Sequence, residues 1–209
     1  MLSKADICNG ALSHLGVSTE IQDLVSEKSK EAQACRRFYD RVRDEVLRDF
    51  AWPFAKQDVA LAVVTDHTDD ENSTSEWSYE YRYPEECIAV RRLYAGGATG
   101  RLNRPELRIE YRIGQDDAGS LILTDLEDAI CEYTKRIDDP TRYPADFAAA
   151  FEFLLAAKIG PRVAGGDQFK LSDRALKLYA AAIAKARSNA ANEEQPDEPE
   201  AGEMERARG

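Results

Sequence analysis

The chain has 209 residues, of which 43% are hydrophobic and 32% are charged, which predicts a soluble globular chain with one sizeable core or a core plus a small second domain. Its 39 acidic residues outnumber its 28 basic ones, and the formal charge of −11 argues against a protein whose main work is to grip phosphate backbones. The sequence has no run of eighteen apolar residues and no signal-like start, so we expect neither a membrane span nor a secretion signal.

Two helices are predicted at the start of the chain. Ser3 and Asp6 form a capping signal, and apolar residues then recur at helical spacing until Gly16. A longer helix is predicted over residues 29–50, because apolar residues step by three and four between arginines and carboxylates. Pro53 ends this second helix, since the residue before a proline is pushed out of the helical region.

The hydrophobic period changes to two after Asp58. One predicted strand alternates polar residues with four aromatic rings, at Trp77, Tyr79, Tyr81 and Tyr83. Further strands are predicted at 59–64, 87–94, 107–113, 121–124 and 129–137, with a hairpin over 114–119. The middle of the chain is therefore predicted to be a meander of short antiparallel strands.

Two more helices are predicted after this strand-rich segment. The third begins near Pro144 and is apolar around nearly its whole circumference, so it belongs at the centre of a bundle and is bent or ended at Gly160 and Pro161. The fourth runs from about residue 167 to 192, with one stripe formed by Leu176, Tyr179, Ile183, Ala186 and Ala190. Residues 193–209 contain seven acidic and two basic residues and no aromatic residue, which predicts a disordered tail.

These elements predict an α+β fold. It consists mainly of a bundle of about four helices, with an antiparallel β insertion and a disordered acidic carboxy-terminal tail. The helical domain is discontinuous, over residues 1–57 and 138–192, and the β-rich insertion occupies residues 58–137.

The residues that most often carry chemistry have no suitable setting in the sequence. His14 lies in the last turn of the first helix and His67 in a charged loop, which predicts a structural or solvated role for the first and solvation for the second. Cys8 and Cys35 lie in apolar helical surroundings, and none of the four cysteines belongs to a C-x-x-C pair. Adjacent carboxylates match no calcium-binding loop. We therefore expect no catalytic residue, no metal and no cofactor.

Two other motifs have simple structural explanations. The glycines Gly96, Gly97 and Gly100 lack the Lys-Ser or Lys-Thr pair of a phosphate-binding loop, and this favours a hairpin tip. The aromatic strand could stack bases, but it offers only Arg82 as a cation. A sequence without these motifs, but with long charged and aromatic surfaces, favours a protein that works as a component of a larger assembly. An enzyme of unknown type and a nucleic-acid-binding regulator are the alternatives, although the arginines of the second helix alternate with acidic residues.

Four segments, in their order and spacing, resemble one known family. They are ADICNGALSHLG (residues 5–16), RVRDEVLRDFAWPFA (41–55), EWSYEYRYP (76–84) and YPADF (143–147). They are similar to the tail tubular protein A family, the head-to-tail adaptors of short-tailed bacteriophages. The likeness covers roughly residues 2–192.

The resemblance implies a structural role in a virion. It implies a ring of twelve copies between the portal protein and the tail nozzle protein, at the portal vertex, with assembly in the host cytoplasm. Genomic DNA would contact the ring only transiently, and the acidic balance suits a channel in which DNA slides. No catalytic residue, cofactor or membrane contact is implied.

This role assigns three sets of contact residues. Contacts with neighbouring copies are expected at Arg36, Arg37, Arg41, Arg43, Arg48, Tyr179 and Ile183. Docking on the portal is expected at Glu193, Glu194, Pro196, Pro199 and Met204, and a contact with the nozzle is expected at Gly96, Gly97 and Gly100. A ring requires heterologous contacts, in which one face of each copy meets a different face of the next.

Overall fold

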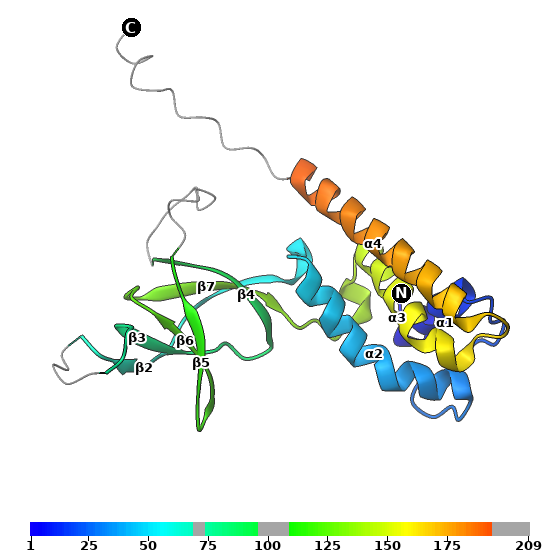
Figure 1. The fold of residues 1–209 in the computed structure, drawn as a ribbon, viewed down its shortest axis with the longest axis horizontal. Helices are drawn as coiled ribbons and strands as arrows, with labels where there is room; N and C mark the ends of the chain where they lie inside the picture. Colours follow the sequence, from blue (N-terminus) through cyan, green and yellow to red (C-terminus); the bar gives the residue numbers. More distant parts are fainter. Residues whose placement is uncertain (69–73, 96–108, 194–209) are drawn as a thin grey trace, which may run out of the picture.

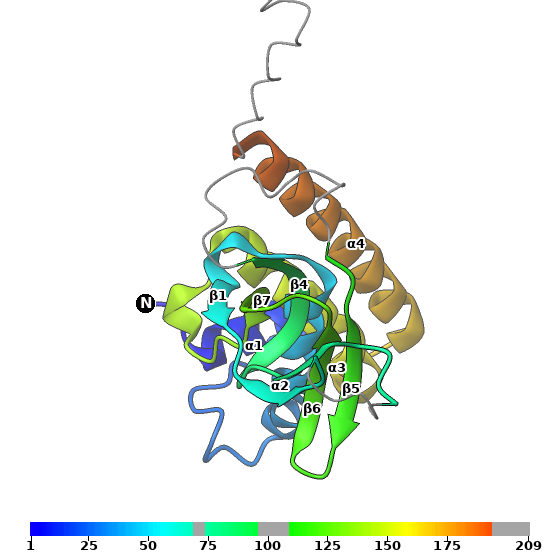
Figure 2. The ribbon, with the colours of Figure 1, turned by 90° about the vertical axis from the view of Figure 1, so that its left-hand side faces the viewer.

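The protein has an α+β fold, seen in a computed structural model that describes residues 1–68, 74–95 and 109–193. Its helices and its strands occupy opposite ends of the long axis (Figure 1). We call these ends the helical region (α1 to α4) and the β-region (β1 to β7). Figure 2, viewed from the β-region, shows the strands in front of the helices.

The first two helices begin where the sequence predicts. α1 (Lys4–His14) is capped by Ser3, whose hydroxyl accepts from the backbone N–H of Asp6, while the Asp6 carboxylate accepts from the backbone N–H of Ser3. α2 (Lys30–Asp49) is capped by the Ser29 hydroxyl. It ends at Asp49, and a short 3-10 helix (Pro53–Ala55) follows.

α3 (Ala145–Val163) is the central helix of the bundle, as its apolar circumference predicts. It packs against α1, α2 and α4 (Gln168–Glu193). Of the two alternatives predicted for Gly160 and Pro161, an end of the helix at these residues is wrong, because α3 continues to Val163 with Pro161 inside it. Gly160 serves a close approach instead: a Cβ placed there would lie 2.3 Å from the Ser172 hydroxyl of α4.

The buried stripe of α4 differs from the predicted one at its first position. Leu176 is 50% exposed, and Ala175 takes the inward place. Ala175, Tyr179, Ile183 and Ala186 are spaced by four, four and three residues, so they lie on the side that packs against α3. The packing against α3 therefore keeps three positions of the predicted stripe and replaces Leu176 with Ala175.

The strands form two antiparallel sheets rather than the predicted meander. The first has the order β1 (Lys56–Ala60), β7 (Ala129–Lys135), β4 (Cys87–Ala95). The second has the order β2 (Val63–Asp66), β3 (Tyr79–Arg82), β6 (Gly119–Thr124), β5 (Arg112–Asp116). The single strand predicted at 59–64 is thus two strands in different sheets.

The chain crosses between the sheets at residues 61 and 62. The N–H of Leu61 donates to the carbonyl of Ala129 in the first sheet, and the carbonyl of Ala62 accepts from Arg82 in the second. The strand predicted at 107–113 begins at Arg112, and the hairpin predicted over 114–119 turns only at residues 117 and 118. These boundaries follow from which strands pair with each other, and a period of two in the sequence does not detect pairing.

The β-region has a small core of its own. It contains Tyr81, Leu93, Ile122 and Cys131, with Tyr79 and Tyr83 packed against it. The aromatic rings predicted to share one face therefore mainly fill this core. The predicted hairpin tip at Gly96–Gly100 and the tail after Glu193 lie outside the described residues. Of the helices that the structure describes, none is long and apolar enough to cross a membrane.

Candidate functional site at the junction of helices and sheets

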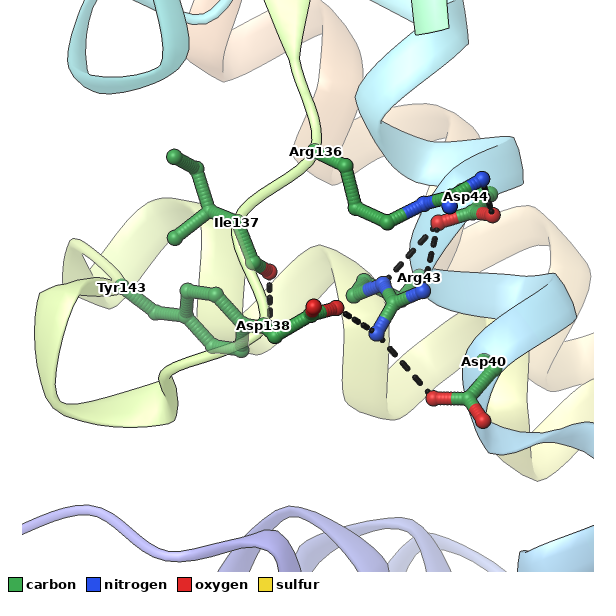
Figure 3. A network of polar contacts seen from close by, with 7 residues as sticks. All are labelled: Asp40, Arg43, Asp44, Arg136, Ile137, Asp138 and Tyr143. Atoms are coloured by element: carbon green, nitrogen blue, oxygen red, sulfur yellow. Dashed lines mark hydrogen bonds and ion pairs between the residues drawn. The ribbon is translucent and has the colours of Figure 1, made fainter. Parts of the chain in front are cut away.

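A buried arginine joins α2 to the segment that leads from β7 into α3. Arg43 is only 5% exposed, and its guanidinium contacts three carboxylates: Asp40 at 3.0 Å, Asp44 at 2.9 Å, and Asp138. Arg136 reaches the same cluster, with its Nη2 3.0 Å from Asp44 (Figure 3). Asp40, Arg43 and Asp44 lie on α2, whereas Arg136 and Asp138 lie on the segment after β7. The cluster therefore joins two parts of the chain that are far apart in the sequence.

The electrostatics of this cluster favour its charged form. Burial alone lowers the pKa of Arg43, but the hydrogen bond and charge of Asp44, together with Asp138 and Asp40, raise it above its ordinary value. The incoming segment is also held by the Tyr143 hydroxyl, which donates to the carbonyl of Ile137 at 2.8 Å (Figure 3). A buried guanidinium that lost these carboxylates would be strongly destabilising.

A second arginine ties the first sheet to the end of α2. Arg91 lies on β4, and its Nη2 donates to the backbone carbonyls of Leu47, Arg48 and Phe50 at 2.9–3.1 Å. Its Nε donates to the Thr134 hydroxyl on β7 at 2.7 Å. Carbonyls at a helix carboxy terminus lack intrahelical partners and favour a nearby cation, so Arg91 caps α2 from the sheet.

The same end of α2 is also contacted by α4. The Tyr179 hydroxyl donates to the Asp49 carboxylate, and Arg187 donates to the Asp49 backbone carbonyl at 3.1 Å. Burial and this hydrogen bond raise the pKa of Tyr179. The end of α2 is therefore held by a strand on one side and by the outer helix on the other.

Several residues predicted to contact a neighbouring copy are used inside the chain. Arg43, Tyr179 and Ile183 are at most 8% exposed, so the prediction that they face another copy needs correction. Arg36 donates to the backbone carbonyl of Glu27 at 2.7 Å and holds the loop before α2. The alternation of apolar and charged residues could not show which arginines turn inward.

The remaining candidates lie at the surface or outside the described residues. Arg37, Arg41 and Arg48 are exposed on α2. Glu193 is the last residue of α4, whereas Glu194, Pro196, Pro199 and Met204 lie outside the described residues. The nozzle candidates Gly96, Gly97 and Gly100 also lie outside them.

Sequence reasoning missed Arg91, Arg136 and Asp138 altogether. A strand pattern shows Arg91 and Arg136 only as polar positions, and Asp138 reads as part of a turn. Their partners are 41 to 95 residues away in the sequence. Only the packing of α2 against β4 and against the segment after β7 brings them together.

Both histidines have carboxylate neighbours. His14 stacks on Phe153 with ring centres 4.5 Å apart, and its Nε2 lies 3.5 Å from Glu152. Burial lowers the pKa of His14, and burial raises the pKa of Glu152 to about 7. Gly10 leaves room for the Glu152 carboxyl group, because a Cβ there would lie 2.4 Å from it.

The second histidine corrects a prediction. The sequence indicates that His67 is solvated, but its side chain is only 18% exposed and its Nε2 lies 3.1 Å from Glu80. This contact joins the end of β2 to β3, which are neighbours in the second sheet. The charged composition of the loop therefore did not reveal the partner.

Three of the four cysteines are buried, Cys87 is partly exposed, and two of the buried ones are neighbours. Cys8 on α1 and Cys35 on α2 are completely buried. The hydrogen bond with Cys35 raises the pKa of Cys8, and burial raises it further. This setting disfavours a reactive thiolate. Within residues 1–68, 74–95 and 109–193, no group of three or more His, Cys, Asp or Glu side chains is placed to hold a metal ion.

No protein family model matches the chain, and no curated protein sequence matches it.

Proposed function

We propose that this protein is a structural head-to-tail adaptor of a phage particle. In this proposal, copies of the chain form a ring between the portal protein and the tail nozzle, and the genome passes through the ring. The sequence segments that resemble tail tubular protein A adaptors are the reason for naming this class of assembly.

The observation that best supports the proposal is the fixed attachment of the β-region to the helical region. Arg91 caps α2 from the first sheet, and the Arg43 cluster holds the segment between β7 and α3. A closed ring requires two contact surfaces at a constant angle within each copy, because a small error in that angle is repeated at every interface. Charge-assisted hydrogen bonds on both sides of α2 supply such a constraint.

Two of the four segments that carry the resemblance lie beside this junction. Residues 41–55 contain the second half of α2 and the 3-10 helix, and residues 143–147 contain the start of α3. Trp52 and Phe54 from the first segment meet Phe147 from the second edge-on, with ring centres 5.0 Å apart in both pairs. The resemblance therefore covers residues that fix the geometry of the subunit rather than a reactive centre.

Electron microscopy of the purified protein, alone and mixed with its portal, tests the proposal. We expect rings seated on the portal, and image averaging would give the number of copies. A protein that stays monomeric and never binds the portal would contradict the proposal. Turnover of a small molecule would favour the enzyme, and tight binding to duplex DNA would favour the regulator.

A further inference from the structure

A basic pocket of about 230 Å³ lies between the start of α2 and the end of α3. It is lined by Lys30, Gln33, Ala34, Arg37 and Arg162. The four residues from α2 are spaced by three, one and three positions, so they share one face of the helix, and Arg162 comes from the last turn of α3. Three cations thus converge on one pocket in a chain whose net charge is −11.

The positive charge of this basic pocket is largely uncompensated. Lys30 lies 3.8 Å from Glu31, and the Arg162 guanidinium lies over the Phe38 ring at 6.0 Å. Within residues 1–68, 74–95 and 109–193, no carboxylate pairs with Arg37 or Arg162. The pocket lies beside the amino terminus of α2, where the helix dipole adds positive potential.

Some arginines of the chain have carboxylate partners within it. Arg43 contacts three carboxylates, and Arg82 lies 2.8 Å from Asp116. Arg37 and Arg162 differ from these two because they line the basic pocket and are exposed. Guanidinium groups bind carboxylates through paired, charge-assisted hydrogen bonds, so a ligand that carries several carboxylates fits this pocket.

We propose that the basic pocket binds the acidic carboxy-terminal segment of a second copy of this chain. Residues 193–209 contain seven carboxylates against two arginines, and four of the carboxylates fall between Glu194 and Glu200. This density of negative charge complements the three cations of the pocket. The inference rests on the proposed assembly, in which copies of the chain meet one another, and it names the two surfaces of one contact.

The segment reaches the pocket of another copy more readily than its own. The pocket lies beside Arg162, just before the start of α4, whereas the segment begins at the other end of that 26-residue helix, about 39 Å away. Figure 1 shows α4 running from the outer end of the bundle back toward the β-region. The eight residues from Glu193 to Glu200 span at most about 25 Å between their first and last Cα atoms. The densest carboxylates therefore fall short of the pocket in the same chain.

Such a contact is heterologous, since it joins the end of one copy to a pocket on the next. This is the kind of contact from which rings are built. It also gives the acidic segment a destination within the ring, in place of the portal contact expected from the resemblance.

Charge reversal in the full-length protein tests the inference. We would measure self-association by sedimentation equilibrium for three double or triple variants. The first carries Arg37→Glu and Arg162→Glu in the pocket. The second carries Asp197→Lys, Glu198→Lys and Glu200→Lys in the segment. The third is a matched control, Arg112→Glu with Arg142→Glu, which reverses two exposed arginines elsewhere.

We expect the pocket variant and the segment variant each to lower the association constant by about tenfold, because each places like charges in contact. The control should associate as the wild type does. A mixture of the pocket variant with the segment variant should recover association, because each then supplies the charge that the other lacks. Circular dichroism of each variant checks that the helices are retained.

Three results would overturn the inference. The first is unchanged association in both variants, and the second is failure of the mixture to recover. The third is loss of duplex DNA binding in the pocket variant while self-association persists, which would make the pocket a phosphate site. Rings that still form on the portal in these cases would leave the proposed adaptor standing. Absence of portal binding by the wild type would count against the adaptor itself.

Discussion

The helical region and the β-region are stabilised in different ways. In the helical region, Trp52, Phe147 and Phe151 are almost completely buried in one continuous apolar core. The β-region has a much smaller core around Tyr81 and Ile122, and every residue of β1 is exposed. Its position depends on charge-assisted hydrogen bonds to α2 and on Ile88 of β4, which is buried in the core of the helical region. Apolar burial therefore stabilises mainly the helical region, whereas the β-region is joined to it by polar contacts together with one buried side chain of β4.

The largest expected effect is in the helical core. Phe147→Ala removes a completely buried ring that contacts Trp52, Phe54 and Tyr143, and we expect it to lower the free energy of unfolding by about 3–5 kcal/mol. Urea denaturation followed by circular dichroism measures the change. Phe169→Ala is the control, because Phe169 is 77% exposed. A comparable loss in this variant would contradict the explanation that burial of the ring causes the effect.

The next effect separates the two regions. Arg91→Met keeps an apolar chain of similar length but removes the donors to three carbonyls of α2 and to Thr134. We expect a loss of about 2–3 kcal/mol. Hydrogen exchange should show faster exchange in β4 and β7, while α3 keeps its protection. Equal acceleration in both regions would mean that Arg91 stabilises the whole chain rather than the junction.

In the helical region, the free energy of unfolding should depend on pH through Glu152 of α3. The raised pKa of Glu152, about 7, means that its contribution to stability is complete below about pH 4.5 and is lost as the pH rises through 7. Glu152→Gln should therefore be nearly neutral at pH 4 and raise the free energy of unfolding by about 2 kcal/mol at pH 8.

His14, which lies beside Glu152, acts in the opposite direction. Burial and the charge of Arg174 lower the pKa of His14, so its contribution to the free energy of unfolding is present above pH 6.5 and is lost as the pH falls below that value. Denaturation curves for wild type and Glu152→Gln between pH 4 and 8 isolate the carboxyl group. A constant difference across this range would contradict the assignment, and Glu20→Gln serves as the exposed control.

The smallest expected effect is at a helix cap. Ser3→Ala removes the hydroxyl that accepts from the Asp6 N–H, and we expect a loss of about 1 kcal/mol. Thermal unfolding should show the change, and Ser3→Asp should restore most of the loss because aspartate also caps helices. Failure of that restoration would show that the Ser3 side chain acts through something other than capping.

The sequence by itself determined the helix starts, the central place of α3 and the α+β class. These depend on interactions between residues a few positions apart, such as Ser3 with Asp6, or on apolarity that any packing must bury. It also identified most strands, although residues 59–64 read as one strand when they form parts of two.

Only the tertiary structure decided the order of the strands, the first inward position of α4 and the junction. A period of two does not say which strand pairs with which, and Ala175 replaces Leu176 at that position of α4. Arg37 and Arg43 look alike in the sequence, yet one is exposed and the other is buried among three carboxylates. The physical reason is that a charged side chain can be buried only among compensating charges, and around Arg43 the carboxylate of Asp138 completes a set that α2 supplies only in part.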